Sequence, residues 1–88
     1  MSDLKLIVRT ADRTKKAEIV LTPQQTGADV IQSAVENWSL PRDTDYSLVN
    51  DTQKKTLNPS DTLAKAGVLA GDVLEVQPVL VAGYRLWL

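Results

Sequence analysis

The sequence predicts an α+β fold in which a mixed sheet of four to five strands packs on one helix. Two early runs, Leu4 to Arg9 and Lys16 to Leu21, alternate apolar and polar residues, which is typical of strands with one buried face. From Val30 to Trp38 the apolar residues instead recur at helical spacing. Shorter strand-like runs follow and end with Val73 to Val76. This order predicts two layers around one core.

The first two strands are predicted to form an antiparallel hairpin. The polar segment Thr10 to Lys15 joins them and contains neither Asn-Gly nor Asp-Gly, so we expect a loop longer than a two-residue turn. Proline cannot donate a backbone hydrogen bond to a sheet, and Thr22-Pro23 therefore ends the second strand.

The helix has recognisable signals at both ends. Thr26 is a candidate N-cap, and Asp29 stands three residues later, in the position of a capping box. Leu40-Pro41 ends the helix, because the residue before a proline disfavours the helical conformation. Between these ends lies one apolar stripe, formed by Val30, Ile31, Ala34, Val35 and Trp38. Trp38 completes the stripe and is interpreted as a core anchor.

After the helix, the sequence predicts short strands separated by turns. They are expected at Tyr46 to Val49, at Thr56-Leu57 and at Val73 to Val76, and Val79 to Val81 extends the last of them past Pro78.

The segment before the final strand is rich in turn residues. Ser60 is expected to cap a single helical turn, Thr62 to Ala66, that directs Leu63 inward. Gly67 and Gly71 are expected to adopt positive φ. The predicted core takes the apolar face of each element: Leu6, Val8, Ile19, Leu21, Val30, Ala34, Leu48, Leu63, Leu74 and Val76.

The composition argues against several classes of function. The chain has 88 residues, a net charge of −1, and no histidine or cysteine. We therefore expect one domain without a nucleic-acid interface, a metal site, a thiol nucleophile or a disulfide. No apolar run approaches the roughly 20 residues of a membrane span. A chain without cysteine has no disulfides, which favours an intracellular protein, and we expect it in the cytoplasm. No carboxylate pair falls in a recognisable catalytic motif, so neither enzymatic activity nor a cofactor is expected.

The order of elements is that of the β-grasp, and the residues themselves resemble ubiquitin. Thr26 and Val30 stand where ubiquitin has its helix cap and its first helix core residue. Leu40-Pro41 resembles the Ile-Pro that follows the ubiquitin helix. Thr56-Leu57 and the turn Asp61-Thr62-Leu63 resemble the late Thr-Leu-Ser-Asp region of ubiquitin.

The end of the chain extends this resemblance. From Val73 to Ala82-Gly83 the sequence matches the length of ubiquitin's last strand and tail, so Ala82-Gly83 falls on the terminal Gly-Gly, with Ala82 replacing the first glycine. Tyr84 to Leu88 lies beyond that point. The resemblance implies a ubiquitin-like β-grasp domain at residues 1–81 and a C-terminal tail at residues 82–88.

Two groups of bacterial ubiquitin-like proteins are similar to this chain. The segment Leu63 to Leu74 resembles the YukD and EsaB proteins of type VII secretion, which implies an accessory role in that pathway. The pattern also resembles bacterial modifiers that are encoded with activating, conjugating and deconjugating enzymes. That second resemblance implies a precursor that a metalloprotease processes after Gly83, which is then activated and conjugated to targets. Glycine suits an adenylation site because it lets the backbone approach closely.

A retained tail supports a different function. Tyr84, Leu86 and Leu88 alternate with Arg85 and Trp87, so the tail is suited to add as a strand to another copy or to a partner. Tyrosine and tryptophan are also residue types that anchor interfaces. The alternative is therefore a non-covalent interaction or assembly module that associates through Tyr84, Leu86, Trp87 and Leu88.

Overall fold

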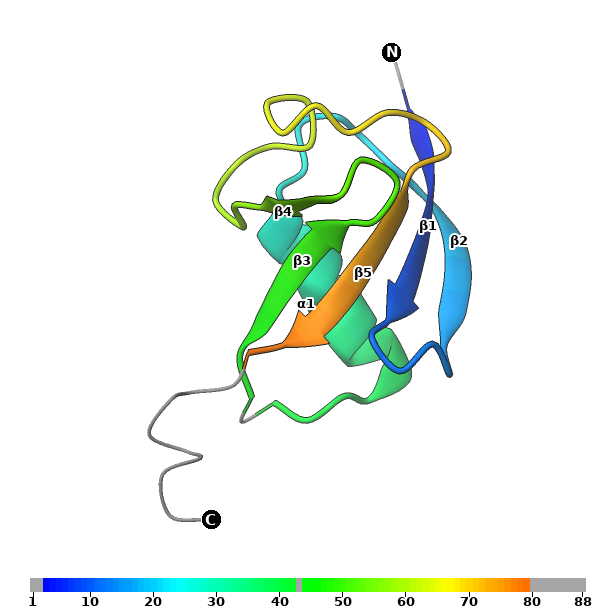
Figure 1. Ribbon diagram of the computed structural model, residues 1–88, viewed down its shortest axis with the longest axis vertical. Coiled ribbons are helices and arrows are strands. Elements are labelled where there is room, and N and C mark those ends of the chain that lie inside the picture. The colour runs from blue at the N-terminus through cyan, green and yellow to red at the C-terminus, as the bar shows by residue number, and fades with distance from the viewer. Residues whose placement is uncertain (1–2, 43, 80–88) are drawn as a thin grey trace.

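A computed structural model describes residues 3–42 and 44–79 of the chain (Figure 1). The elements are β1 (Leu4–Thr10), β2 (Lys16–Leu21), α1 (Gly27–Trp38), β3 (Tyr46–Asn50), β4 (Lys55–Leu57) and β5 (Val73–Pro78). The helix crosses one face of a five-stranded sheet (Figure 1). The predicted α+β class, with one helix packed on a mixed sheet, is confirmed.

The strands of the sheet follow the order β2-β1-β5-β3-β4. The last strand lies in the centre, because β5 pairs parallel with β1 and antiparallel with β3. Val8 on β1 is the partner of both Ala17 and Leu74, and Leu6 is the partner of Ile19. The two edges differ in length, since β2 has six residues and β4 has three.

The ends of α1 follow the sequence signals. Thr26 accepts a hydrogen bond from the Asp29 N–H at 3.2 Å, and the Asp29 carboxylate accepts one from the Thr26 N–H at 3.1 Å. This reciprocal pair is the predicted capping box. At the other end Ser39 adopts a left-handed conformation with φ of 52°, and the Leu40 N–H donates to the Val35 carbonyl at 3.0 Å. The helix therefore ends before Pro41, as expected.

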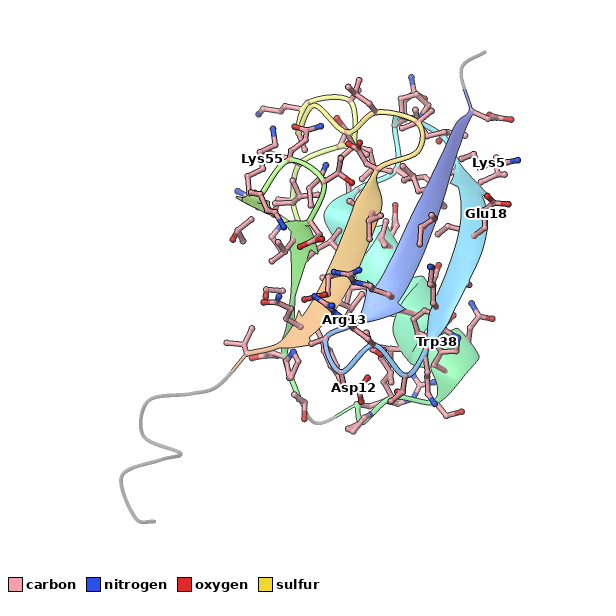
Figure 2. The ribbon with its side chains drawn as sticks, turned by 45° about the vertical axis from the view of Figure 1, so that its right-hand side comes forward. Lys5, Asp12, Arg13, Glu18, Trp38 and Lys55 are labelled. Atoms are coloured by element: carbon pink, nitrogen blue, oxygen red, sulfur yellow. The ribbon has the colours of Figure 1, made fainter. Side chains whose placement is uncertain are left out.

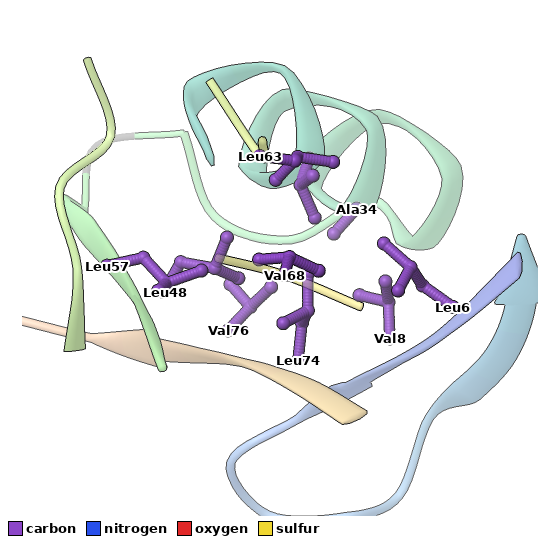
Figure 3. Packing of buried hydrophobic residues seen from close by; sticks show 10 residues of the cluster. Leu6, Val8, Ala34, Leu48, Leu57, Leu63, Val68, Leu74 and Val76 are labelled. Carbon is purple, nitrogen blue, oxygen red and sulfur yellow. The ribbon is translucent and has the colours of Figure 1, made fainter. Parts of the chain in front are cut away.

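The core lies between α1 and the inner face of the sheet. In Figure 3, Ala34 and Leu63 lie on the helix side and Leu74 and Val76 on the sheet side. Eight predicted core residues are buried: Leu6, Val8, Val30, Ala34, Leu48, Leu63, Leu74 and Val76. The prediction was wrong for Ile19 and Leu21, which are only half-buried because they lie on the edge strand β2. Among the described residues, two buried hydrophobic residues were missed, Leu57 and Val68.

Four strands are longer than the side-chain pattern indicated, and one of them, β4, begins at Lys55, one residue earlier than predicted. β1 continues through Thr10, whose N–H donates to the Lys15 carbonyl at 3.0 Å. β3 continues through Asn50, which is the partner of Lys55. β5 continues through Pro78. Backbone pairing with a neighbouring strand, which side-chain alternation does not encode, sets these ends.

The turn after β4 is capped by Thr62. Its Oγ1 accepts a hydrogen bond from the Lys65 N–H at 3.1 Å. The prediction that Ser60 caps this turn was wrong, because the capping oxygen belongs to Thr62. Ser60 lies one step earlier in an Asx turn, where its N–H donates to the side-chain oxygen of Asn58 at 2.9 Å. The two downstream glycines have positive φ as predicted, 75° at Gly67 and 91° at Gly71.

Candidate protein-interaction site

The final strand brings the chain to one end of the sheet. The Val79 N–H donates to the Asp45 carbonyl at 2.8 Å, beside the end of β3. At the same end, the Ala11 N–H in the hairpin loop donates to the Val76 carbonyl at 3.1 Å. The predicted extension of the last strand was Val79 to Val81. Val79 makes the hydrogen bond to Asp45, and residues 80–81 lie outside the described residues. So do all predicted tail sites: Ala82, Gly83, Tyr84, Leu86, Trp87 and Leu88.

A shallow pocket of about 290 Å³ lies beside this exit. The Tyr46 hydroxyl donates to the Pro41 carbonyl at 2.8 Å and holds the segment after α1 against β3. Leu40, Val76 and Pro78 contribute apolar surface to the pocket. The hydrogen bond of Tyr46 and the apolar pocket residues therefore surround the end of β5 at this end of the sheet.

An apolar groove of about 340 Å³ lies between β2 and α1. It exists because the helix covers the centre of the sheet more completely than its β2 side. Ala17 and Ile19 are half-buried, whereas their β1 partners Val8 and Leu6 are buried. Trp38, at the end of α1, lies on the β2 side of the molecule (Figure 2). The groove is lined by Val8, Ala17, Ile19, Val30, Ser33, Ala34, Asn37 and Trp38.

The opposite face of the sheet carries an ionic network. Arg9 donates from Nε to the Glu75 carboxylate at 2.9 Å and places Nη2 3.1 Å from the Asp51 carboxylate, a contact that is ionic and lacks hydrogen-bond geometry. A hydrogen bond from Gln77, with Arg9 in addition, lowers the pKa of Glu75 despite burial. A hydrogen bond from Lys54, with nearby charges, lowers the pKa of Asp51. Ionised carboxylates matched by cations are typical of a structural network and not of a general acid or base.

Asp72 is the centre of a buried polar cluster. Its Oδ2 accepts hydrogen bonds from the Asn50 side chain at 2.9 Å, the Gln53 side chain at 2.8 Å and the Leu69 N–H at 3.0 Å. Burial raises the pKa of Asp72, but these hydrogen bonds outweigh it and leave the pKa lowered. The cluster ties the loop after β3 to the segment before β5, which is a structural role.

Within residues 3–42 and 44–79, no three acidic, histidine or cysteine side chains form a group that could hold a metal ion. Over the same residues, no helix combines the length and apolar character needed to cross a membrane. The surface features that the described residues present are the apolar groove between β2 and α1, the outer edge of β2, which pairs with no other described strand, and the end of the sheet where β5 finishes.

Comparison with known proteins identifies the architecture. No protein-family profile and no curated protein sequence matches the chain. Among solved structures, a ubiquitin of Caldiarchaeum subterraneum matches with a TM-score of 0.74 and 24% identity, over 93% of this chain and 100% of that one. This chain has the ubiquitin-like fold.

Two further structures are similar to the ubiquitin-like domain. A designed protein based on ubiquitin has a TM-score of 0.74 and 18% identity, over 91% of this chain and 93% of its own. A structure described as molecular mimicry of SUMO that promotes DNA repair has a TM-score of 0.72 and 16% identity, over 91% and 94%. At these identities the likeness concerns the fold.

Sequence reasoning missed the groove of this ubiquitin-like domain. Two signals were available. Ala17 is the smallest residue on the apolar face of β2, which leaves room beside the helix. Ser33 and Asn37 place polar groups one helical turn apart next to the apolar stripe, and both line the groove.

Proposed function

We propose that this ubiquitin-like chain is a protein modifier, made as a precursor and processed after Gly83. The observation that carries the proposal is where the final strand ends. Val79 is held to Asp45 at the end of the sheet. Gly83 follows four residues later, and four extended residues span about 13–14 Å. That reach is enough for Gly83 to enter the site of an enzyme docked at this end while β5 stays in the sheet.

The chemistry requires partners that the chain itself does not supply. Hydrolysis of the Gly83–Tyr84 peptide bond consumes one water and frees the Gly83 carboxylate, which is the task of a deconjugating metalloprotease. An activating enzyme then couples that carboxylate to a nucleoside monophosphate, drawn from a nucleoside triphosphate with release of pyrophosphate. Transfer through a conjugating enzyme to an amine of the target releases the monophosphate and forms an amide. These steps would take place in the cytoplasm of a bacterial host.

The packing supports a removable tail. The buried part of β5 ends at Val76, and within the described residues no core residue lies beyond it. Cleavage after Gly83 removes no residue that takes part in a described hydrogen bond or in the buried core of residues 3–42 and 44–79. The processed chain is therefore expected to keep the fold of the precursor.

The test is the mass of the protein recovered from its native host. A mass that ends at Gly83, with part of the protein shifted upward by covalent targets, supports the modifier. Incubation of the purified chain with the host metalloprotease should give one cut between Gly83 and Tyr84. Gly83→Val should block conjugation, whereas the matched control Ala82→Gly, which restores Gly-Gly, should not. A cut at another position, or conjugation of the Gly83→Val chain, would reject the proposal.

The YukD and EsaB resemblance of Leu63 to Leu74 supports a second candidate, an accessory role in type VII secretion. In that role the chain acts without covalent attachment. The same mass measurement separates the two candidates, since recovery of only intact chain that ends at Leu88 favours the accessory role.

A further inference from the structure

Among residues 3–42 and 44–79, no strand pairs with the outer edge of β2, which lies beside an apolar groove. Strand β1 occupies one side of β2, so about half of the backbone N–H and C=O groups of β2 point away from the sheet. A strand added at this edge gains a hydrogen-bonded ladder and directs alternate side chains into the groove. The other edge differs, because β4 has only three residues and carries the exposed Lys55. Short edge strands with lysine resist the addition of a further strand.

The chain supplies a segment of matching character in its last five residues. Tyr84, Leu86 and Leu88 fall on one face of an extended strand, and Arg85 and Trp87 fall on the other. One face is entirely apolar or aromatic. The other combines one positive charge with one large aromatic group.

We propose that residues 84–88 of one copy add in parallel to β2 of a second copy and fill its groove. In this register Tyr84 lies beside Ala17, the small residue that leaves the groove open. Leu86 lies beside the half-buried Ile19. Both tail side chains then enter the space that Trp38 borders.

The outward-facing side chains of β2 favour a parallel over an antiparallel orientation of the added strand. In the same register Arg85 lies beside Glu18, whose side chain is 61% exposed and reaches Lys5 only at 3.8 Å. Trp87 lies beside Val20, an apolar residue that is 58% exposed. An antiparallel strand that keeps Arg85 beside Glu18 leaves Val20 uncovered. The parallel register satisfies both the charge and the exposed apolar side chain.

The tail belongs to a second copy because its own groove is out of reach. Ala17, Val8 and Leu74 are aligned across the sheet, and Val79 lies five residues beyond Leu74. A Tyr84 placed outside Ala17 is thus about 16 Å back along the strands and three strand spacings, about 14 Å, across them. The direct distance from Val79 is about 22 Å. Five residues span at most about 18 Å.

Each copy has one tail to donate and one groove to receive it. The contact is therefore head-to-tail and builds rings or open chains of copies. Cleavage after Gly83 removes the donor segment and returns the chain to a monomer. This last link rests on the proposed function, whereas the assembly of the intact chain does not.

Sedimentation velocity of the intact chain over a range of concentrations up to millimolar tests the assembly. We expect oligomers that grow with concentration. Residues 1–83 alone should remain monomeric at an unchanged melting temperature. Added to the intact chain, residues 1–83 should shorten the oligomers, because they accept a tail and donate none. Trp87→Ala should weaken association roughly 10- to 100-fold.

A charge swap tests the register. Glu18→Arg and Arg85→Glu should each weaken association about fivefold, and the double variant should restore it. Glu36→Arg, on an exposed helix position outside the groove, is the matched control and should leave association unchanged. Melting temperatures of all variants establish that they fold.

Four outcomes would overturn the proposal or its register. An intact chain that stays monomeric at every concentration removes the assembly. Oligomers that persist in residues 1–83 place the contact elsewhere. A truncation that lowers the melting temperature of a monomeric chain assigns the tail to its own domain, with the pocket beside Tyr46 and Pro78 as the nearest site. Failure of the double charge variant to recover association rejects the parallel register on β2. A wild-type chain that forms the expected oligomers but is not conjugated to targets would contradict the proposed function and leave the assembly proposal in place.

Discussion

The centre of the sheet and its β2 side are made from the same alternating pattern but have different environments. Leu6 on β1 is fully buried, while its partner Ile19 on β2 is only half-buried. The difference arises because β1 has neighbours on both sides, whereas β2 has one and the helix does not close over it. The centre thus holds the fold together, and the β2 side leaves apolar surface accessible.

The largest expected effect comes from a charge placed in the centre. Val30 on α1 is 1% exposed and packs on the sheet. Val30→Asp should unfold the domain, because an unpaired buried charge costs several kcal/mol, comparable to the stability of a small domain. Ser33→Asp, one turn away beside the groove, is the matched control and should remain folded. Circular dichroism melting measures both, and a Val30→Asp chain with near-normal melting would contradict this account of the centre.

A pair of truncations measures the difference between the two partners directly. Leu6→Ala should lower the free energy of unfolding by about 3 kcal/mol, since it opens a cavity in a closed core. Ile19→Ala should lower it by about 1 kcal/mol, because its side chain is already partly in solvent. Urea denaturation gives both values. Equal losses would mean that the β2 side is as well packed as the centre, and the groove would then lose its physical basis.

The stability that the buried Asp72 cluster contributes should decrease in acid. Asp72→Ala removes an acceptor of three hydrogen bonds and should cost about 2 kcal/mol at neutral pH. The folded pKa of Asp72 is lowered, so its contribution is complete above the unfolded pKa of about 4 and is lost as the pH falls through the folded pKa. The stability gap between wild type and Asp72→Ala should therefore narrow below about pH 4.

A second carboxylate provides the control for this acid response. Asp12 is exposed in the hairpin loop, and hydrogen bonds from Thr10 and Thr14 lower its pKa to about 2. In a chain that carries Asp12→Asn, the further change Asp72→Ala should still cost less stability below about pH 4 than at neutral pH, since Asp12 and Asp72 share no hydrogen-bond partner. A gap that stays constant from pH 7 to about pH 2 would show that the Asp72 carboxylate does not titrate as its hydrogen bonds imply.

The sequence predicted the elements well because their patterns are local. The capping box at Thr26 and Asp29 lies within one turn, and the alternation of β1 and β2 is read from each strand alone. Burial on β2 was overestimated because coverage depends on where the helix crosses, which is a property of tertiary packing. Leu57 and Val68 were missed because Leu57 is the one apolar residue of a three-residue strand and Val68 lies in an irregular segment, so neither belongs to a periodic pattern.

The candidate sites divide in the same way. A tail is visible as a run of residues, so Ala82, Gly83 and the residues after them were singled out from the sequence and remain predictions. The groove is made by residues from β1, β2 and α1 that are far apart in the chain. No local pattern joins Ala17 to Trp38, and only their arrangement in space shows that both border one hollow.

The smallest expected effect comes from a valine-to-threonine exchange on the edge strand β2. Val8 and Val20 are both strand valines, but Val8 is 3% exposed and Val20 is 58% exposed. Threonine has a similar branched shape and is also enriched in strands, so valine-to-threonine exchange changes mainly the cost of burying a hydroxyl group. Val8→Thr should cost about 1–2 kcal/mol because its hydroxyl enters the core. Val20→Thr should change the stability of the monomer by less than about 0.5 kcal/mol.

Chemical denaturation of residues 1–83 carrying each variant measures these values without a tail present. In the intact chain, Val20→Thr should still weaken association, since Val20 is covered only when a strand adds beside it. A Val20→Thr variant that destabilised the monomer as much as Val8→Thr would mean that the edge of β2 is already covered within a single chain.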